Sequence, residues 1–160
     1  MATEIERKFL VVGDAWRAVA THREHLRDGL IATTADRKVR VRIYEEDERA
    51  TITIKARNGG ITNAEFEYDI PMTDAEELLA SHCGEYVLGK CRYFVPHRDF
   101  LWHVDVYEGI FDGVILAEVE VAKEDAAVPI PPWVGQEVTG RSEYKKREML
   151  RARLATAVHG

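Results

Sequence analysis

The chain is poor in cysteine and has no long apolar run, and each shortage excludes a class of protein. Two cysteines among 160 residues cannot build a disulfide framework, which favours a reducing, cytoplasmic compartment. A membrane helix needs about 20 consecutive apolar residues, and the runs here are much shorter, so no membrane partner is expected. Basic residues are outnumbered, 22 to 28, and the net charge of −6 argues against a broad nucleic-acid surface.

What the chain does contain is period-two alternation of apolar and polar residues, which is typical of strands with two different faces. The alternation is clear in segments 3–11, 38–44, 51–56, 65–70, 104–107 and 118–121, and weaker near 25–33 and 86–97. Helices are expected after Asp14, over a segment opened by a capping box from Thr73 to Glu76 and stopped at Gly84, and from about Ser142. We therefore predict one α+β domain over residues 1–160, with about eight antiparallel strands.

Ionisable residues are sorted by sign along these strands. The doublets and triplets at i, i+2 are Glu4/Glu6/Lys8, Arg40/Arg42, Lys55/Arg57, Glu65/Glu67, Lys90/Arg92 and Glu118/Glu120. Any one of them fits an ordinary solvated face, but like charges on one face repel, and the six together fit that interpretation less well. The sorting makes sense if the strands close into a barrel with a charged bore, with the apolar faces outside and covered by helices.

The composition of such a bore indicates its ligand. Carboxylates without histidine or cysteine suit a hard divalent cation, Mg²⁺ or Mn²⁺. Converging arginine and lysine side chains suit phosphate oxygens. A site with both kinds of side chain is suited to a polyphosphate that is chelated by a metal.

The run E-x-E-x-K formed by Glu4, Glu6 and Lys8 resembles the signature of the CYTH superfamily, the triphosphate tunnel metalloenzymes. The resemblance continues in family order through segments 40–42, 53–55, 65–67, 90–92, 102–109, 116–120 and 132–139. It implies an eight-stranded antiparallel closed β-barrel, or tunnel, with flanking helices, which binds triphosphate compounds with a divalent metal. The compact length most resembles the small bacterial members that cleave inorganic tripolyphosphate.

The resemblance implies a role for each charged group. The phosphate-binding residues would be Lys8, Arg40, Arg42, Lys55 and Arg92. The metal, Mg²⁺ or Mn²⁺, would be held by Glu118 and Glu120 with Glu4, Glu6 and Asp105. Glu4, Glu6 and Lys90 would be catalytic, whereas Glu65 and Glu67 would fix the basic side chains in place.

Some positions depart from the family pattern. Leu30 stands where a tyrosine is common, so a lysine–tyrosine pair proposed as a base in some relatives cannot form there with Lys90. Asn63 stands where an arginine is usual, and Arg141 and Ser142 replace an acidic and a basic residue. These departures concern the rate and the C-terminal contacts rather than the fold.

Other functions remain open at this point. A relative acting on a nucleotide or an organic triphosphate, such as an adenylyl cyclase or a thiamine triphosphatase, needs a site for the base or thiazolium, and the sequence reveals none. A non-catalytic module for polyphosphate or nucleotides is less favoured, because the acidic doublets Glu4/Glu6 and Glu118/Glu120 are intact. Outward apolar faces leave room for a homodimer.

Overall fold

The computed structural model describes residues 3–57 and 60–159, with side chains as far as residue 155, and nine strands lie in this part of the chain. They are β1 (Thr3–Val11), β2 (His22–Thr33), β3 (Arg37–Tyr44), β4 (Arg49–Arg57), β5 (Thr62–Ile70), β6 (Val87–His97), β7 (Phe100–Tyr107), β8 (Ile115–Glu120) and β9 (Val134–Glu137). The weaker predictions near 25–33 and 86–97 correspond to the two long strands β2 and β6.

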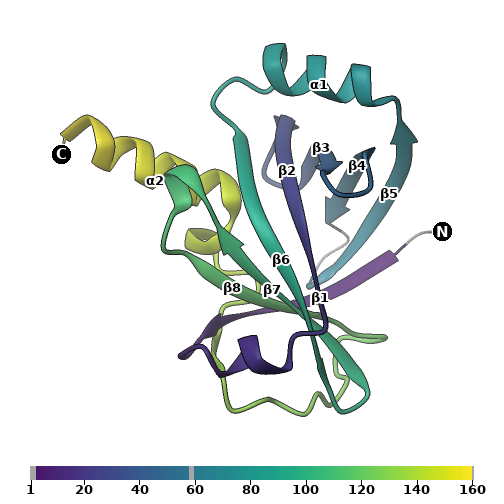
Figure 1. The fold of residues 1–160 in the computed structure, drawn as a ribbon, viewed down its shortest axis with the longest axis vertical. Helices are drawn as coiled ribbons and strands as arrows, with labels where there is room; N and C mark the ends of the chain where they lie inside the picture. The colour runs from purple at the N-terminus through teal and green to yellow at the C-terminus, as the bar shows by residue number, and fades with distance from the viewer. Residues whose placement is uncertain (1–2, 58–59, 160) are drawn as a thin grey trace.

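Eight of these strands form a closed antiparallel barrel (Figure 1). Hydrogen-bonded neighbours follow the order β5-β4-β3-β2-β6-β7-β8-β1, and a further ladder between β1 and β5 closes the ring. The short strand β9 adds to β1 beside the ring. The predicted eight-stranded antiparallel barrel with flanking helices is confirmed.

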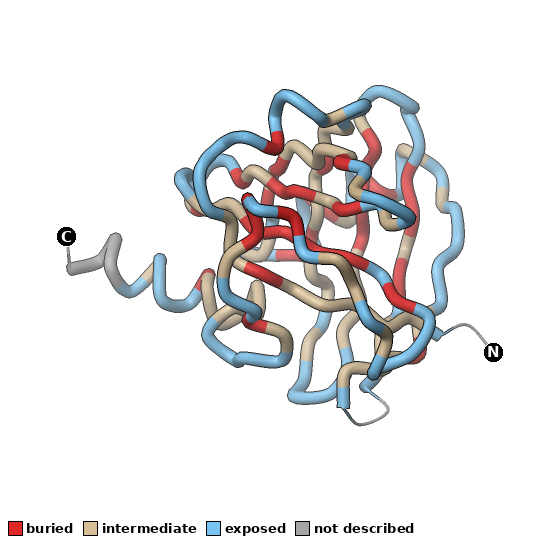
Figure 2. The backbone as a smooth tube through the Cα atoms, turned by 90° about the horizontal axis from the view of Figure 1, so that it is seen from below, coloured by how far each residue is buried: buried red, intermediate tan, exposed pale blue. Residues whose placement is uncertain are grey.

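Two clusters of the apolar core lie outside the barrel wall, one under α1 (Met72–Ser81) and one around Trp102, and a third lies on the inward strand faces at the end of the barrel near the C-terminal helix. The helix α1 places Ala75 and Leu79 against Val41 and Ile43 on the outer side of β3. Gly29 permits this approach, because a Cβ atom there would lie 2.4 Å from Leu79 Cδ2. Figure 2 shows buried positions recurring along the strands, while the connecting loops are exposed.

A second helix, α2 (Lys146–His159), packs at one end of the barrel beside β7 and β8 (Figure 1), against residues of the inward strand faces. Its Leu150 is buried in a cluster with Leu88, Tyr107, Phe111 and Leu116. Three short 3₁₀ helices complete the structure of the described residues: η1 (Ala15–Val19), η2 (Gly109–Phe111) and η3 (Ser142–Tyr144). None of the helices described here is long and apolar enough to cross a membrane.

Two local predictions differ from the structure. The capping box expected at Thr73 and Glu76 is wrong, because α1 begins at Met72, after Pro71, without a side-chain cap. The Glu76 side chain instead accepts a hydrogen bond from Arg27 at 2.7 Å. At its other end α1 stops at Ser81, and Gly84 adopts its left-handed φ of 56° in the following turn rather than at the helix end.

The apolar outer face is not covered everywhere. Ile54 on β4 and Phe66 and Tyr68 on β5 are exposed by 43%, 38% and 59%. The expectation that helices cover the outward apolar faces therefore holds for β2 and β3 but not for this part of β4 and β5. The predicted homodimer remains a prediction.

Candidate active site

The polar faces of the eight barrel strands line an internal cavity of about 230 Å³. The ladder registers place acids beside bases, since Lys8 on β1 is the partner of Glu118 on β8 and Arg92 on β6 is the partner of Asp105 on β7. Ten of the eleven predicted site residues line this cavity: Glu4, Glu6, Lys8, Arg40, Arg42, Lys55, Lys90, Arg92, Glu118 and Glu120. The remaining one, Asp105, is fully buried in the wall.

Asp105 is engaged by two predicted site residues. Its carboxylate accepts hydrogen bonds from Lys90 Nζ at 2.8 Å and from Arg92 Nε and Nη2 at 2.8 and 3.0 Å. Burial alone would raise the pKa of Asp105, but Arg92 and Lys90 hold it well below its usual range. These contacts give Asp105 the geometry of a positioning group for the two bases, and its predicted role as a metal ligand stays a prediction.

Asp28 holds Arg42 as Asp105 holds Arg92. The sequence did not indicate Asp28 as a partner. The Arg42 guanidinium donates from Nε and Nη2 to the two carboxylate oxygens at 2.6 and 2.8 Å. Asp28 is also 3.8 Å from Lys90 Nζ. Burial works against ionisation, yet Arg42 keeps the pKa of Asp28 below its usual range. The signal that could have found Asp28 is its inward position on β2, one strand from Arg42.

Lys55 is the fourth paired base. Its Nζ donates to Glu4 at 2.7 Å and lies 3.4 Å from Glu65. Glu65 thus fixes a basic side chain, as predicted. Glu67 differs from the prediction, because among the described residues it forms no ion pair with a base and instead accepts a hydrogen bond from Thr53 at 3.3 Å.

Three other cations in the bore have no carboxylate within ion-pair distance among the described residues. They are Lys38, Arg40 and Lys146. Within the described part of the chain, Arg40 donates only to the Thr53 hydroxyl, at 3.4 Å, and its buried Nε has no hydrogen-bond partner. Burial and neighbouring cations lower the pKa of Arg40 and lower that of Lys38 well below its usual range.

Lys8 is only loosely neutralised. Its Nζ is 4.0 Å from Glu118 and donates to the Tyr144 carbonyl at 3.3 Å. Burial and the nearby Lys146 lower the pKa of Lys8 to about 8. Part of the positive charge in the bore therefore has no carboxylate in close contact among the described residues.

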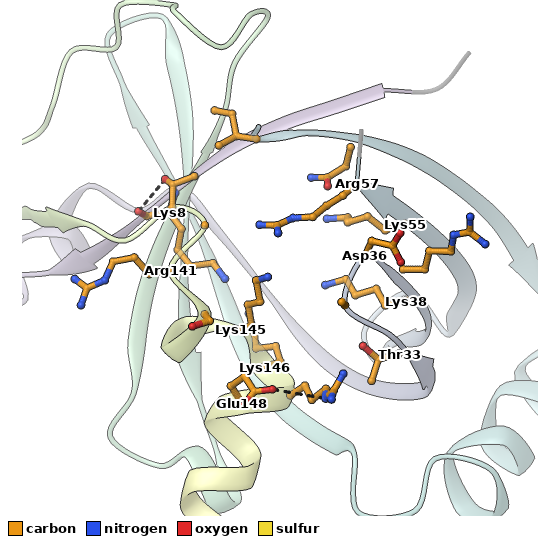
Figure 3. Close-up of a pocket in the computed structure, with 18 of the residues that line it drawn as sticks. Lys8, Thr33, Asp36, Lys38, Lys55, Arg57, Arg141, Lys145, Lys146 and Glu148 are labelled. Atoms are coloured by element: carbon orange, nitrogen blue, oxygen red, sulfur yellow. Dashed lines mark hydrogen bonds and ion pairs between the residues drawn. The ribbon is translucent and has the colours of Figure 1, made fainter. Parts of the chain in front are cut away.

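Lys38 and Lys146 were missed as site residues for different reasons. Lys38 continues the i, i+2 face of Arg40 and Arg42, and that spacing could have identified it. Lys146 comes from α2, so its place in the bore depends on how α2 folds back, which no strand pattern encodes. Lys8, Lys38 and Lys146 project from three different elements toward one space (Figure 3).

The acidic side of the bore centres on Glu6 and Glu118. Burial and the adjacent Glu118 raise the pKa of Glu6 to about 7. Burial would raise the pKa of Glu118 too, but Lys146 and Lys8 hold it well below its usual range. Glu120, the ladder partner of Glu6, is exposed at the rim.

A divalent cation in this bore would need oxygen ligands besides its carboxylates. In the described ranges, no three side chains of aspartate, glutamate, histidine or cysteine converge closely enough to hold a metal by themselves. Magnesium commonly binds through one or two carboxylates together with substrate phosphates. Glu6 and Glu118 fit that mode, in which phosphate oxygens complete the coordination shell.

A wider cavity of about 490 Å³ opens from the bore at the end near α2 (Figure 3). It shares Glu6, Lys8, Lys38, Lys55 and Lys146 with the bore. Further basic side chains line it, namely Arg37, Arg57, Arg141, Lys145 and Arg147. This mouth is strongly basic in a chain whose net charge is −6.

A closed antiparallel barrel with a charged bore, unneutralised cations and a carboxylate pair defines a tunnel-type binding protein for polyanions. The chain belongs to the CYTH domain family, which matches residues 2–152. The family resemblance expected from the sequence motifs is therefore confirmed.

The chain is similar to named relatives over nearly its whole length. An inorganic triphosphatase of Acetivibrio thermocellus is 36% identical over 151 residues, which cover 94% of this chain and 95% of the relative. An inorganic triphosphatase of Nitrosomonas europaea is also 36% identical over 151 residues, covering 92% of this chain and 96% of the relative. A crystal structure of an inorganic triphosphatase is similar with a TM-score of 0.65 and 33% identity, covering 94% of this chain and 95% of that one.

Proposed function

We propose that this protein is a metal-dependent inorganic triphosphatase, which cleaves the terminal phosphate of tripolyphosphate inside the barrel. The observation that carries the proposal is the cluster of bases without carboxylate partners, Lys38, Arg40 and Lys146, in a closed bore. Burying unpaired charge is costly, so such a cluster is explained by an anionic ligand that neutralises it. Relatives of similar length named inorganic triphosphatase support the choice of anion.

The shape of the site favours an inorganic chain over a nucleotide. The bore is charged on most sides, which suits a slim string of phosphates. No aromatic side chain is among the described residues that line the mouth, so a base leaving the bore finds no aromatic face to stack on. This supports tripolyphosphate over ATP or thiamine triphosphate.

The bases divide into two groups with different tasks. Arg42, Lys90 and Arg92 are held by Asp28 and Asp105, which fixes the directions of their remaining N–H groups before substrate arrives. The unpaired bases would supply charge that only the substrate neutralises. Donors fixed in advance stabilise developing phosphoryl charge without reorganising during the reaction.

Glu6 and Glu118 would hold Mg²⁺ or Mn²⁺ together with phosphate oxygens. When bound, the cation would neutralise charge on the transferred phosphoryl group and help to activate water. Water would attack the terminal phosphorus, the bond to the bridging oxygen would break, and phosphate and pyrophosphate would leave. Burial lowers the pKa of Lys90 to about 7, so its amine can hold or release a proton near neutral pH. The predicted roles of Glu4 and Glu120 as additional ligands belong to this proposal.

The test is phosphate release from tripolyphosphate, pyrophosphate, ATP and thiamine triphosphate, each with Mg²⁺, with Mn²⁺ and with a chelator. We expect metal-dependent release from tripolyphosphate, with kcat/KM at least an order of magnitude above that for pyrophosphate. Pyrophosphate leaves some bases unpaired, and each lost charged hydrogen bond costs about 1–3 kcal/mol. Cyclic AMP formation, or ATP outcompeting tripolyphosphate, would replace the proposal with a nucleotide-using function. Tight binding of tripolyphosphate without turnover would identify a binding module.

A further inference from the structure

The hydroxyl of Tyr107 is a polar group at the bore that is not hydrogen-bonded by any described residue. It lies on the inward face of β7 with His103 and Asp105, and its side chain lines the cavity. The residue is only 2% exposed, and its hydroxyl oxygen has no hydrogen-bond partner in the described part of the chain. Buried hydroxyls are normally hydrogen-bonded, so an orphan at a cavity wall indicates that a ligand supplies the partner.

Packing on the Tyr107 ring fixes the direction of its hydroxyl group. Phe111 packs edge-on against it, with the ring centroids 5.7 Å apart. The same cluster includes Leu116 and Leu150, both about 1% exposed, so the ring is clamped between the barrel wall and α2. The position of the hydroxyl is therefore set by packing.

Two ammonium groups flank this ring. Lys90 Nζ lies 5.4 Å from the ring centroid and Lys146 Nζ lies 5.3 Å from it. Lys90 is neutralised by Asp105, whereas Lys146 has no carboxylate within ion-pair distance among the described residues. The Tyr107 ring thus lies near Lys90, which is paired with Asp105, and near Lys146 at the start of α2, which has no carboxylate partner among the described residues.

We propose that the Tyr107 hydroxyl donates a hydrogen bond to a substrate phosphate oxygen that is held between Lys90 and Lys146, with α2 supplying the second cation. This inference rests on the proposed function and adds a substrate contact to it. The phenol stays protonated and no bond breaks. An uncharged donor adds a contact to the phosphate without adding repulsion to a bore already crowded with cations.

The decisive variant is Tyr107→Phe in the full chain, which removes the hydroxyl and keeps the ring. Since the hydroxyl makes no bond in the free protein, we expect the melting temperature without ligand to stay the same or rise slightly. We expect the stabilisation by tripolyphosphate, measured with a chelator present, to shrink, and kcat/KM to fall about tenfold or more. Tyr68→Phe is the matched control, because Tyr68 is exposed on the outer wall of β5.

Lys146→Met tests the second half of the inference. It removes the charge and keeps most of the chain length, so KM for tripolyphosphate should rise about tenfold with little change in the free protein's stability. Lys123→Met, at an exposed position outside both cavities, is the control. If the two residues hold the same phosphate, the double variant Tyr107→Phe/Lys146→Met should lose less than the product of the two single losses.

The outcomes separate the two proposals. If the wild type neither gains stability with tripolyphosphate nor releases phosphate, the proposed function fails and this inference fails with it. If the wild type responds and Tyr107→Phe matches it, only the inference is overturned. A lower melting temperature of Tyr107→Phe without ligand, combined with an unchanged ligand-induced shift, would identify the hydroxyl as structural and would also overturn it.

Discussion

Asp28 and Arg42 are directly opposite each other on β2 and β3 and form a two-point ion pair inside the barrel. Arg40, two residues away on the same face, has no carboxylate partner among the described residues, and its Nε is buried without a hydrogen bond. In the sequence the two arginines form a simple doublet. In the structure one is held by the protein and the other is available to a ligand.

The two arginines should therefore respond differently to removal. Arg42→Met leaves the Asp28 carboxylate buried without its main partner, so the free energy of unfolding should fall by about 3 kcal/mol or more. Arg40→Met removes a half-buried cation that lacks a carboxylate partner among the described residues, so the free protein should keep its stability while KM for tripolyphosphate rises. Urea denaturation of both variants, with and without tripolyphosphate, measures the difference.

The double variant Asp28→Leu/Arg42→Met is the control for the first effect. Removing both members of a buried pair avoids the unpaired charge, so part of the lost stability should return. Equal stability losses in Arg40→Met and Arg42→Met would contradict this division of roles.

Glu118 should matter more to turnover than Glu120. Glu118 is 6% exposed and lies near Lys8, at 4.0 Å, and Arg92, at 3.8 Å, whereas Glu120 is exposed at the rim. Glu118→Gln should lower kcat with Mg²⁺ by orders of magnitude, because a neutral amide is a poor ligand for a hard cation. Glu120→Gln serves as the comparison and should have a much smaller effect. Near wild-type kcat in Glu118→Gln at saturating metal and substrate would refute its assignment as a ligand.

Glu6 makes a specific contribution to the dependence of stability on pH. Its pKa is about 7 in the folded protein, raised from 4.5 by burial and by Glu118. The folded state thus binds this proton more tightly than the unfolded chain does. The stabilisation is complete below pH 4.5 and is lost as the pH rises toward 7, and its total is on the order of 3 kcal/mol.

Unfolding free energies of wild type and Glu6→Gln, measured from pH 4.5 to 8, test this contribution. The variant cannot ionise at this position, so its stability should decline less over that range than that of the wild type. Mg²⁺ binds the ionised carboxylates, so it should bind the wild type more tightly at pH 8 than at pH 6. Parallel stability curves for the two proteins would show that Glu6 has an ordinary pKa.

The barrel could be predicted from the sequence because its physical signal is local. Period-two alternation marks each strand, and the sorting of charges at i, i+2 indicates which face points inward. The same sorting includes twelve of the side chains that line the bore. It did not reveal that Arg42 is paired and Arg40 is not, because that distinction depends on Asp28, a residue of a different strand.

The contributions of α2 to the site could not be predicted for a related reason. Lys146 enters the bore and Tyr107 is clamped beneath Leu150 only because α2 folds back onto the barrel wall. The helical spacing of its apolar residues predicts an amphipathic helix but not where that helix docks. The capping box expected at Thr73 failed similarly, since Glu76 has a stronger partner in Arg27 on β2.

Lys38 provides a test of the unpaired cations that is independent of α2. It lies beside Lys55 across the β3–β4 ladder, and burial together with Lys55 and Arg40 lowers its pKa well below the usual range. Lys38→Met should therefore raise the melting temperature of the free protein, because it removes a crowded cation and leaves no carboxylate without its partner. The same change should raise KM for tripolyphosphate and reduce the stabilisation that tripolyphosphate gives, because a phosphate contact is lost.

Lys55→Met is the contrasting variant, since it leaves Glu4 and Glu65 unpaired and should destabilise the free protein. A lower melting temperature for Lys38→Met without ligand would show that Lys38 supports the fold. Lys38 would then no longer be assigned as a ligand-binding cation.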